Sequence, residues 1–341
     1  MNILERLYYA GFLVKQRYSL AHRERLPFRV VSVGNITTGG TGKTPATMAI
    51  AREALNRGLA PVILTRGYRG KAKGPCFVTR GDGPLLSVPE AGDEPYLMAS
   101  RLRKVPIVKG PDRYQDGVFA IDGLGLQLNA PESCVLFILD DGFQHVRLFR
   151  DRDVVLMDAN DPFGGQRLLP AGKLREPASS LERADIIVIT KSGPRMGTLG
   201  PAIEKTINTI REYNSKAPLF VADHLSVSAA DRQGREYPPS ALAGEKIYGF
   251  CGIGSPESFR RTLLDSGGDV AGFRNFRDHH AYTLPDILSL RREAERLGCR
   301  WIVTTEKDII KINHLDLPEN ILIIRIDFSI DGSFYDYVFG R

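Results

Sequence analysis

The stretch VGNITTGGTGKTP, residues 33–45, decides the fold of this 341-residue chain. It follows an apolar run at 28–33 and precedes a run with helical spacing at 44–56. Glycines let backbone N–H groups curl around phosphate oxygens, a lysine reaches the β and γ phosphates, and a hydroxyl holds Mg²⁺. The order of strand, loop and helix therefore predicts a P-loop that binds a nucleotide through Thr37, Thr38, Gly39, Gly40, Thr41, Gly42, Lys43 and Thr44.

The loop departs from the usual P-loop pattern at two positions. That pattern has a glycine five residues before Gly42, where this chain has Thr37. Many loops with a GG-x-GK-T core also have a lysine just before the paired glycines, where this chain has Thr38. The second departure argues against an ATPase that relies on that lysine.

Apolar runs alternate with helical patterns on both sides of the loop. We expect strands at 28–33, 61–65, 105–108, 134–139, 153–157 and 185–190, and helices at 44–56, 94–103, 112–121 and 201–213. Strands that are apolar throughout are typical of a parallel sheet covered on both faces. Residues 27–216 are therefore expected to form a doubly wound, mostly parallel α/β P-loop domain.

A second, smaller α/β domain is expected at 244–341, after a hairpin linker at 217–243. The linker alternates around Asp231 and Gly234 and ends in a turn-rich run. Beyond it, strands are expected at 246–251, 301–305 and 321–326, with helices at 256–265 and 284–297.

The N-terminal segment, residues 1–26, is expected to form a basic amphipathic helix. Apolar residues recur at helical spacing from Ile3 to Tyr18, with Arg6, Lys15 and Arg17 between them. Such a helix either lies on an anionic membrane surface or packs on its own domain, and the sequence leaves both open. No uncharged apolar run is long enough for a spanning helix, and no signal peptide is expected.

The composition limits the classes of partner. The net charge of +6 favours anionic partners, and the four separated cysteines suggest neither a zinc site nor disulfides, as in a reducing cytoplasm. Lysines and arginines are not grouped with aromatic residues, which disfavours nucleic acid. The sequence also indicates no obligatory protein partner.

An acidic pair, Asp140 and Asp141, follows the apolar run 134–139. A carboxylate at the end of a parallel strand holds Mg²⁺ beside a P-loop, because these strand ends meet the phosphates. The alternative is a simple strand-terminal turn, in which Asp is common.

Seven segments, in order, resemble the motifs of the tetraacyldisaccharide 4′-kinase (lipid A 4′-kinase) family. They are VGNITTGGTGKTP, GDEP at 92–95, KGPDR at 109–113, DDGFQH at 140–145, KLREP at 173–177, DHH at 278–280 and TEKD at 305–308. The resemblance implies transfer of the ATP γ-phosphate, with Mg²⁺, to the 4′-hydroxyl of tetraacyldisaccharide 1-phosphate, a lipid A precursor, giving lipid IVA. It also implies a peripheral protein at the cytoplasmic face of the inner membrane.

The resemblance further assigns the proton transfer to Asp93, with His279 as its partner. On spacing alone Asp93 is better explained as a helix N-cap, with Pro95 in the first turn. The choice of His279 over His280 rests on the family analogy. Because His279 falls in the second predicted domain, closure of the two domains over the substrate is expected.

Further residues receive roles from their type and their position in the sequence. Lys43 and Arg113 act on the phosphates, Glu176 joins Thr44, Asp140 and Asp141 at Mg²⁺, and Tyr68, Gln144 and Arg175 contact the acceptor. A surface arginine at 113 and a surface ion pair at 175–176 are the alternatives. Lys307 and Asp308 either approach the nucleotide or form an ion pair at a helix start. The rival function is a P-loop ATPase or GTPase regulatory switch at the membrane, for which Asp93 and His279 are dispensable.

Overall fold

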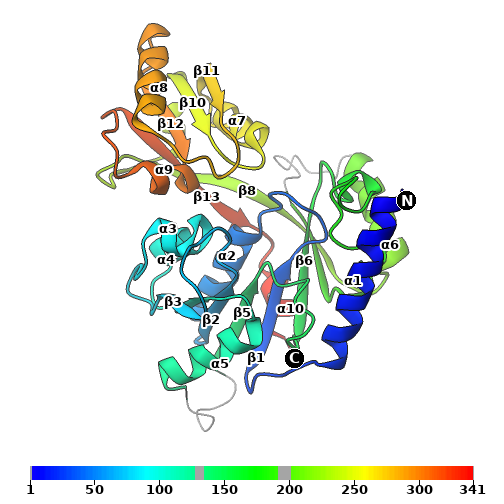
Figure 1. Cartoon of the computed structure of the whole chain (residues 1–341). Coiled ribbons are helices and arrows are strands. Elements are labelled where there is room, and N and C mark those ends of the chain that lie inside the picture. The colour runs from blue at the N-terminus through cyan, green and yellow to red at the C-terminus, as the bar shows by residue number, and fades with distance from the viewer. Residues whose placement is uncertain (1, 127–133, 191–200, 341) are drawn as a thin grey trace. The chain divides into compact units, whose positions relative to one another are not determined.

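The computed structural model describes residues 2–126, 134–190 and 201–340, which divide into two units (Figure 1). The first unit contains Met1–Asp223 and Phe328–Arg341, and the second contains His224–Asp327. The division falls inside the expected linker. The C-terminal 14 residues differ from the expectation, because they belong to the first unit rather than to the smaller domain.

The first unit is built on a mostly parallel sheet. Its strand order is β8-β7-β6-β1-β5-β2-β4-β3, and only the β3–β4 pair in this series is antiparallel. The bounds are β1 (Arg29–Gly34), β2 (Ala60–Thr65), β3 (Cys76–Thr79), β4 (Ile107–Lys109), β5 (Val135–Asp140), β6 (Arg152–Asp158), β7 (Ile186–Thr190) and β8 (Leu219–Ala230). The register pairs Val33 at the end of β1 with Asp140 at the end of β5.

Helices cover both faces of this sheet. Neighbouring residues of a strand point to opposite faces and therefore pack in different cores. Val31 packs in one core with residues of α2 (Lys43–Asn56), α4 (Asp93–Arg101) and α10 (Ser333–Phe339). Val30 packs in another core, with α5 (Arg113–Leu124). A third core joins β6 and β7 to α1 (Ile3–Ala21) and α6 (Pro201–Tyr213). The expected α/β architecture with a mostly parallel sheet is confirmed.

The second unit contains a parallel set of strands in the order β11-β10-β12-β13. These are β10 (Lys246–Cys251), β11 (Asp269–Asn275), β12 (Trp301–Thr305) and β13 (Ile321–Ser329), and the helices are α7 (Pro256–Asp265), α8 (Leu284–Arg296) and α9 (Glu306–Ile312). β9 (Glu236–Tyr237) pairs antiparallel with the end of β8 across the turn at Asp231, where the sequence indicates a hairpin. β8 leads into the second unit, and β13 returns to the first.

Several short elements are absent from the sequence prediction. The missing elements are β3, β11, α9, α10 and α3 (Val88–Ala91). Three 3₁₀ helices, at Gly164–Gln166, Ala178–Arg183 and Pro239–Leu242, were also not predicted. In β11 every residue is half-buried or exposed, and Gly272 interrupts it, so the sequence lacks the apolar run that marks the other strands. Tertiary pairing with β10 makes it a strand.

The C-terminal helix α10 should stabilise the first unit. Phe334 is fully buried, and its ring lies 5.5 Å from that of Phe220 in β8. Phe334→Ala is expected to lower the free energy of unfolding by about 3–5 kcal/mol, because it leaves a cavity in the core. The measurement is urea unfolding followed by circular dichroism. Tyr337→Ala, on the same helix but 53% exposed, is the control and should change the free energy by about 1.5 kcal/mol or less, because it loses only an edge contact with Phe220 at 5.7 Å. Equal effects of the two variants would contradict this packing.

Candidate functional site

The glycine-rich loop leads from β1 into the N-terminus of α2. Gly42 is the N-cap of α2 with a left-handed φ of 84°, and no side chain caps the helix. A Cβ added to Gly39 or Gly40 would meet no other atom within 4 Å. The first N–H groups of a helix point outward unpaired, and the loop that leads to them is open at Gly39 and Gly40. The loop and helix start therefore form an anion site of the kind that phosphates occupy.

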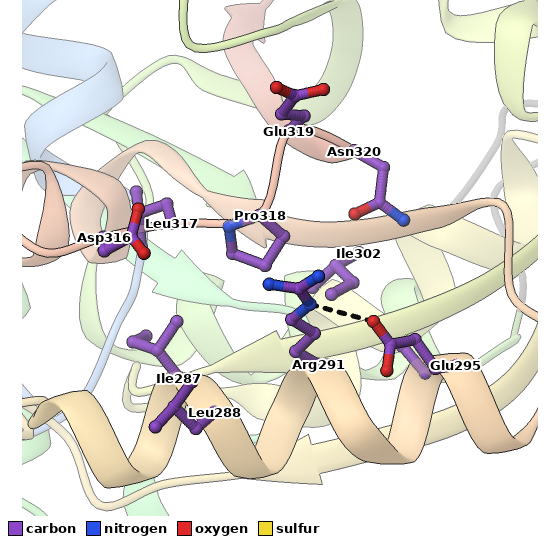
Figure 2. Close-up of a pocket in the computed structure, with 11 residues that line it drawn as sticks. Ile287, Leu288, Arg291, Glu295, Ile302, Asp316, Leu317, Pro318, Glu319 and Asn320 are labelled. Atoms are coloured by element: carbon purple, nitrogen blue, oxygen red, sulfur yellow. Dashed lines mark hydrogen bonds and ion pairs between the residues drawn. The ribbon is translucent and has the colours of Figure 1, made fainter.

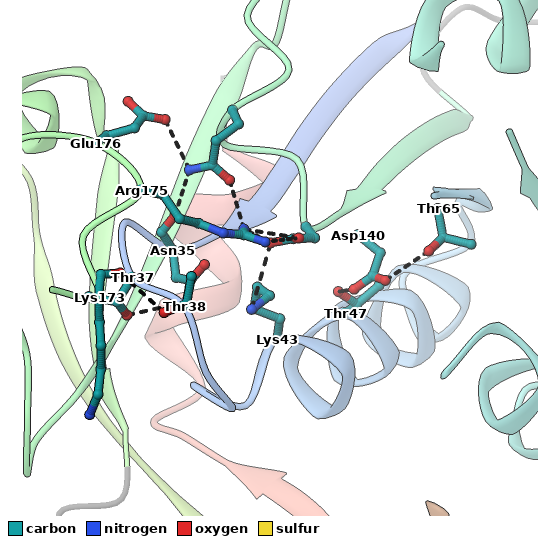
Figure 3. Close-up of polar contacts among 12 residues, drawn as sticks. Asn35, Thr37, Thr38, Lys43, Thr47, Thr65, Asp140, Lys173, Arg175 and Glu176 are labelled. Atoms are coloured by element: carbon teal, nitrogen blue, oxygen red, sulfur yellow. Dashed lines mark hydrogen bonds and ion pairs between the residues drawn. The ribbon is translucent and has the colours of Figure 1, made fainter. Parts of the chain in front are cut away.

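A second segment, residues 173–175, runs alongside the loop (Figure 3). The Thr38 N–H donates to the Lys173 carbonyl at 2.7 Å, and the Arg175 N–H donates to the Ile36 carbonyl at 2.8 Å. This backbone pairing gives the KLREP motif a physical reason. It brings Arg175 to the loop, although the two segments are more than 130 residues apart in sequence.

Arg175 and Lys43 both form ion pairs with the Asp141 carboxylate. Arg175 Nη1 donates to Asp141 Oδ1 at 2.8 Å and Nη2 donates to Oδ2 at 3.0 Å, while Lys43 Nζ is 3.6 Å from Oδ1. Burial alone would raise the pKa of Asp141, but the attraction of Lys43 and Arg175 outweighs burial and lowers it below its ordinary value. Asp141 therefore stays ionised and holds both cations beside the loop.

Asp140 has the opposite electrostatics. The residue is 3% exposed, and its carboxyl accepts hydrogen bonds from Thr65 Oγ1 at 2.9 Å and Thr47 Oγ1 at 3.3 Å. Burial, with the nearby charges of Glu94 and Asp141, raises its pKa from 3.8 to about 6. Two adjacent carboxyl groups are thus pushed to different pKa values, an arrangement that is frequent at functional sites.

Gln144 and Glu176 complete this polar network. Gln144 Nε2 donates to the Asn35 carbonyl at 2.8 Å and to Glu176 Oε1 at 2.9 Å, and its Oε1 accepts from Arg175. Glu176 is 1% exposed, and Arg183 donates to its second oxygen at 2.7 Å. The alternative of a simple surface ion pair at residues 175–176 is therefore wrong. Within the described residues, no three histidine, cysteine, aspartate or glutamate side chains gather as a metal site.

Arg113 is buried rather than on the surface. It is 2% exposed, donates to the Gly110 carbonyl at 2.8 Å and lies 3.3 Å from Asp116. Its Nε and Nη2 atoms have no hydrogen-bond partner, and burial raises the pKa of Asp116 to about 7. The surface-arginine alternative is wrong, and the positive charge of Arg113 acts on Asp140 and Asp141 through the protein interior.

Asp93 lies at the start of α4, but it is not the N-cap. Gly92, with φ of 93°, is the cap, and Asp93 is the first helical residue, half-buried. The N-cap alternative is therefore wrong. A Cβ on Gly92 would lie 2.7 Å from the Tyr68 carbonyl, so the loop that carries Tyr68 packs directly against the GDEP turn. The Tyr68 side chain is 57% exposed.

His279 and His280 lie in the second unit in different environments. His279 adopts a left-handed φ of 59°, its side chain is 14% exposed, and Nε2 lies 3.8 Å from Asp278. His280 Nε2 is 3.2 Å from Asp286, and its ring stacks on Phe276 at 4.6 Å. These contacts explain His280 as a structural residue.

Helix α1 packs on the first unit through one face. Glu5 is 1% exposed and lies 3.0 Å from Arg167, and the Tyr8 hydroxyl donates to the Arg175 carbonyl at 2.8 Å. A cavity of about 370 Å³ lies between this helix and the site, and its lining includes Tyr8, Gly11, Lys15, Gln144, Arg175 and Glu176. Sequence reasoning missed this contact with the site, because the spacing that marks α1 carries no information about what it packs on.

Another side of α1 is exposed and apolar, and it borders this cavity at Leu7 and Gly11. The exposed side chains there are Ile3, Leu4, Leu7, Val14 and Tyr18, at 55–75%. Of the two alternatives for this helix, packing on its own domain holds for one face only. None of the helices within the described ranges combines the length and apolar character needed to cross a membrane.

A second cavity, of about 460 Å³, lies in the second unit between α8 and residues 316–320 (Figure 2). Its rim carries the Arg291–Glu295 ion pair at 2.8 Å. No residue of the seven motifs lines it.

The raised pKa of Asp140 makes a testable contribution to stability. A carboxyl whose pKa is higher in the folded state destabilises that state as pH rises, here between about pH 4 and pH 7. Asp140→Asn removes this term, so its free energy of unfolding should exceed that of the unsubstituted protein by an amount that grows with pH, to roughly 3 kcal/mol. The measurement is urea unfolding from pH 4.5 to 8 without nucleotide or metal. Asp82→Asn, at an exposed aspartate, is the control, and a difference that shrinks with pH would contradict the assignment.

Comparison with known proteins places this site in a family. A family model described as tetraacyldisaccharide-1-P 4′-kinase (LpxK) matches residues 1–339. The tetraacyldisaccharide 4′-kinase of Syntrophus aciditrophicus (strain SB) is 38% identical over 98% of this chain and 90% of its own length. That of Halothermothrix orenii is 34% identical over 98% and 89%. The crystal structure of LpxK from Aquifex aeolicus in complex with ATP matches with a TM-score of 0.74 and 31% identity over 98% of this chain and 96% of that one. The chain therefore belongs to the tetraacyldisaccharide 4′-kinase family.

Proposed function

We propose that this protein transfers the γ-phosphate of ATP to the 4′-hydroxyl of a tetraacyl disaccharide 1-phosphate. The observation that carries the proposal is the open glycine loop at the uncapped start of α2, with Lys43 and the Asp140–Asp141 pair beside it. Membership of the kinase family supplies the identity of the acceptor.

The chain's own residues suit the holding of a polyphosphate. Backbone N–H groups of the loop and of the first turn of α2 would hold the phosphate oxygens, and Lys43 would bring a positive charge to the same place. Arg175, fixed by Asp141 and Gln144, presents a planar guanidinium beside the loop.

Thr44 and Asp140 are the residues that we propose hold Mg²⁺. The ion, when bound, supplies charge neutralisation at the β and γ phosphates. Mg²⁺ usually keeps several waters and phosphate ligands, so a site with few protein carboxylates fits it. Asp140, buried with a raised pKa, would lose its proton on binding the ion. Asp141 and Glu176, each already engaged by cations, would act through water.

Proton transfer from the acceptor hydroxyl is proposed for Asp93, assisted by His279. Asp93 opens α4 beside the Tyr68 loop, is half-buried and is not the helix cap. Tyr68, Gln144 and Arg175 are proposed to contact the acceptor. The two proposed proton-transfer residues belong to different units, so the roles of Asp93 and His279 predict that both units serve one step.

The proposal predicts that Asp93→Asn and His279→Ala slow phosphoryl transfer while ATP still binds. Each variant is expected to lower kcat by about 100-fold or more, because general-base assistance is lost. The measurement is product mass after incubation with Mg-ATP and tetraacyl disaccharide 1-phosphate, with ATP affinity followed by titration. Asp82→Asn is a matched control. Lipid-independent ATP hydrolysis without a phosphorylated product would instead support the regulatory-switch function.

We further propose that the exposed face of α1 contacts the membrane in which the acceptor resides. Positions 3, 4, 7, 11, 14 and 18 fall within an arc of about 100° on a helical projection. Arg6, Lys15 and Arg17 flank this arc. An exposed apolar row edged by basic side chains matches the pattern of helices that lie in a bilayer interface.

Charges placed in the apolar row should weaken membrane binding. Leu7→Asp combined with Val14→Asp is expected to reduce co-sedimentation with anionic liposomes by about fivefold or more. The two aspartates would place negative charges where the apolar face enters the acyl region. Leu20→Asp is the control, since Leu20 is 45% exposed on another side of the same helix. Equal losses from both substitutions would indicate a charge effect, and unchanged binding of the double variant would refute the contact.

A further inference from the structure

A fully buried carboxylate, Asp308, lies within the second unit at the start of α9. Its side chain is 0% exposed. Oδ2 accepts from the Gly252 N–H at 3.1 Å and from Thr305 Oγ1 at 2.7 Å. Oδ1 accepts from the Tyr282 hydroxyl at 2.9 Å and pairs with Lys311 Nζ at 2.8 Å. Each oxygen thus has two partners, which a buried carboxylate needs in order to remain stable.

One of these hydrogen bonds leads directly to His279. Gly252, which follows β10, donates its N–H to Asp308 and accepts the His279 N–H through its carbonyl at 3.2 Å. A Cβ on Gly252 would lie 3.0 Å from the Tyr282 hydroxyl and 3.2 Å from Asp308 Oδ1, so the packing leaves little slack. Asp308 therefore holds Gly252, the residue whose carbonyl accepts the His279 N–H.

A second hydrogen bond fixes the far end of the same loop. Tyr282 donates to Asp308, and its ring lies 4.9 Å from the His280 ring and 5.0 Å from the Phe276 ring. Phe276 in turn donates its N–H to the Cys251 carbonyl at 2.8 Å. The loop 276–280 is held at both ends, and Asp308 acts at both.

The conformation of His279 explains why such support is needed. A left-handed φ at a non-glycine residue is strained and persists only when surrounding contacts fix it. Lys307, next to Asp308, also lies 3.4 Å from Asp278, the residue before His279. Two adjacent residues of the TEKD motif thus support the DHH motif. Because Asp308 is completely buried, it cannot contact a substrate directly.

We propose that Asp308 is the positioning residue that fixes the backbone and ring of His279. This inference rests on the proposed function for its effect on turnover, but the placement of His279 can be measured without any reaction. The proposal replaces the expectation that Asp308 approaches the nucleotide.

The direct test is nuclear magnetic resonance of the full chain with isotope-labelled histidine. The His279 ring signal is identified by its loss in His279→Ala. Asp308→Asn should shift or broaden the His279 signal while the signals of His22, His145 and His314 stay unchanged. Glu293→Gln, which alters the hydrogen bond from Tyr248 in the same unit, is the matched control and should leave His279 unchanged. An unchanged His279 signal in folded Asp308→Asn overturns the proposal.

Kinetics provide the second readout. Asp308→Asn should lower kcat by about tenfold or more with the KM for ATP within about twofold, as expected when only a transition-state contact is lost. In the His279→Ala background the same substitution should change kcat by less than about twofold, because residues that act through one another are not additive. Effects that multiply in the double variant would show independent action and overturn the proposal.

Two further results, an unfolded Asp308→Asn variant and a fully active His279→Ala variant, can be told apart from a failure of the proposal. If Asp308→Asn does not fold, Tyr282→Phe removes one donor while keeping the carboxylate, and it should shift the His279 signal and lower kcat several-fold; an unchanged signal and kcat overturn the proposal. If His279→Ala retains full activity, the proposed role of His279 fails, and the resonance of His279 in Asp308→Asn still decides whether Asp308 positions it.

Discussion

The register between β1 and β5 is the constraint on which the first unit depends. It sets Val33, where the chain turns into the glycine loop, opposite Asp140, where β5 ends in two carboxyl groups. Because the sheet is parallel at this point, the loop, the start of α2 and the acidic pair emerge at one edge. A slip of one residue would turn the side chains of β5 to the other face and separate Asp140 from Thr47 and Thr65.

At this edge, the surroundings of each carboxyl group decide its protonation state. Asp141 carries two cations and stays ionised, whereas its neighbour Asp140 is surrounded by threonine hydroxyls and holds its proton more tightly. Lys43 is therefore oriented before any phosphate arrives, since its partner is fixed by Arg175. Pre-oriented groups of this kind need less rearrangement when charge develops during transfer.

The fold also ties the site to its surroundings through single contacts. Tyr8 connects α1 to the carbonyl of Arg175, so the helix with the exposed apolar row is bonded to a residue at the phosphate loop. In the second unit, Asp308 performs a comparable structural task for the loop that carries His279. In both places a polar contact from a segment distant in sequence holds a motif segment in position, at Arg175 in the first unit and at His279 in the second.

The sequence by itself determined the parallel α/β class, the loop and its lysine, the strand that ends in two aspartates, and the family. These depend on local patterns, namely apolar runs, glycine spacing and motif order, which survive without knowledge of packing. Only the tertiary structure decided that Arg113 is buried, that Gly92 rather than Asp93 caps α4, and that the C-terminal helix joins the first unit. It also decided the opposed pKa values of Asp140 and Asp141. Burial and charge at a residue are set by segments far away in sequence, and no local pattern records them.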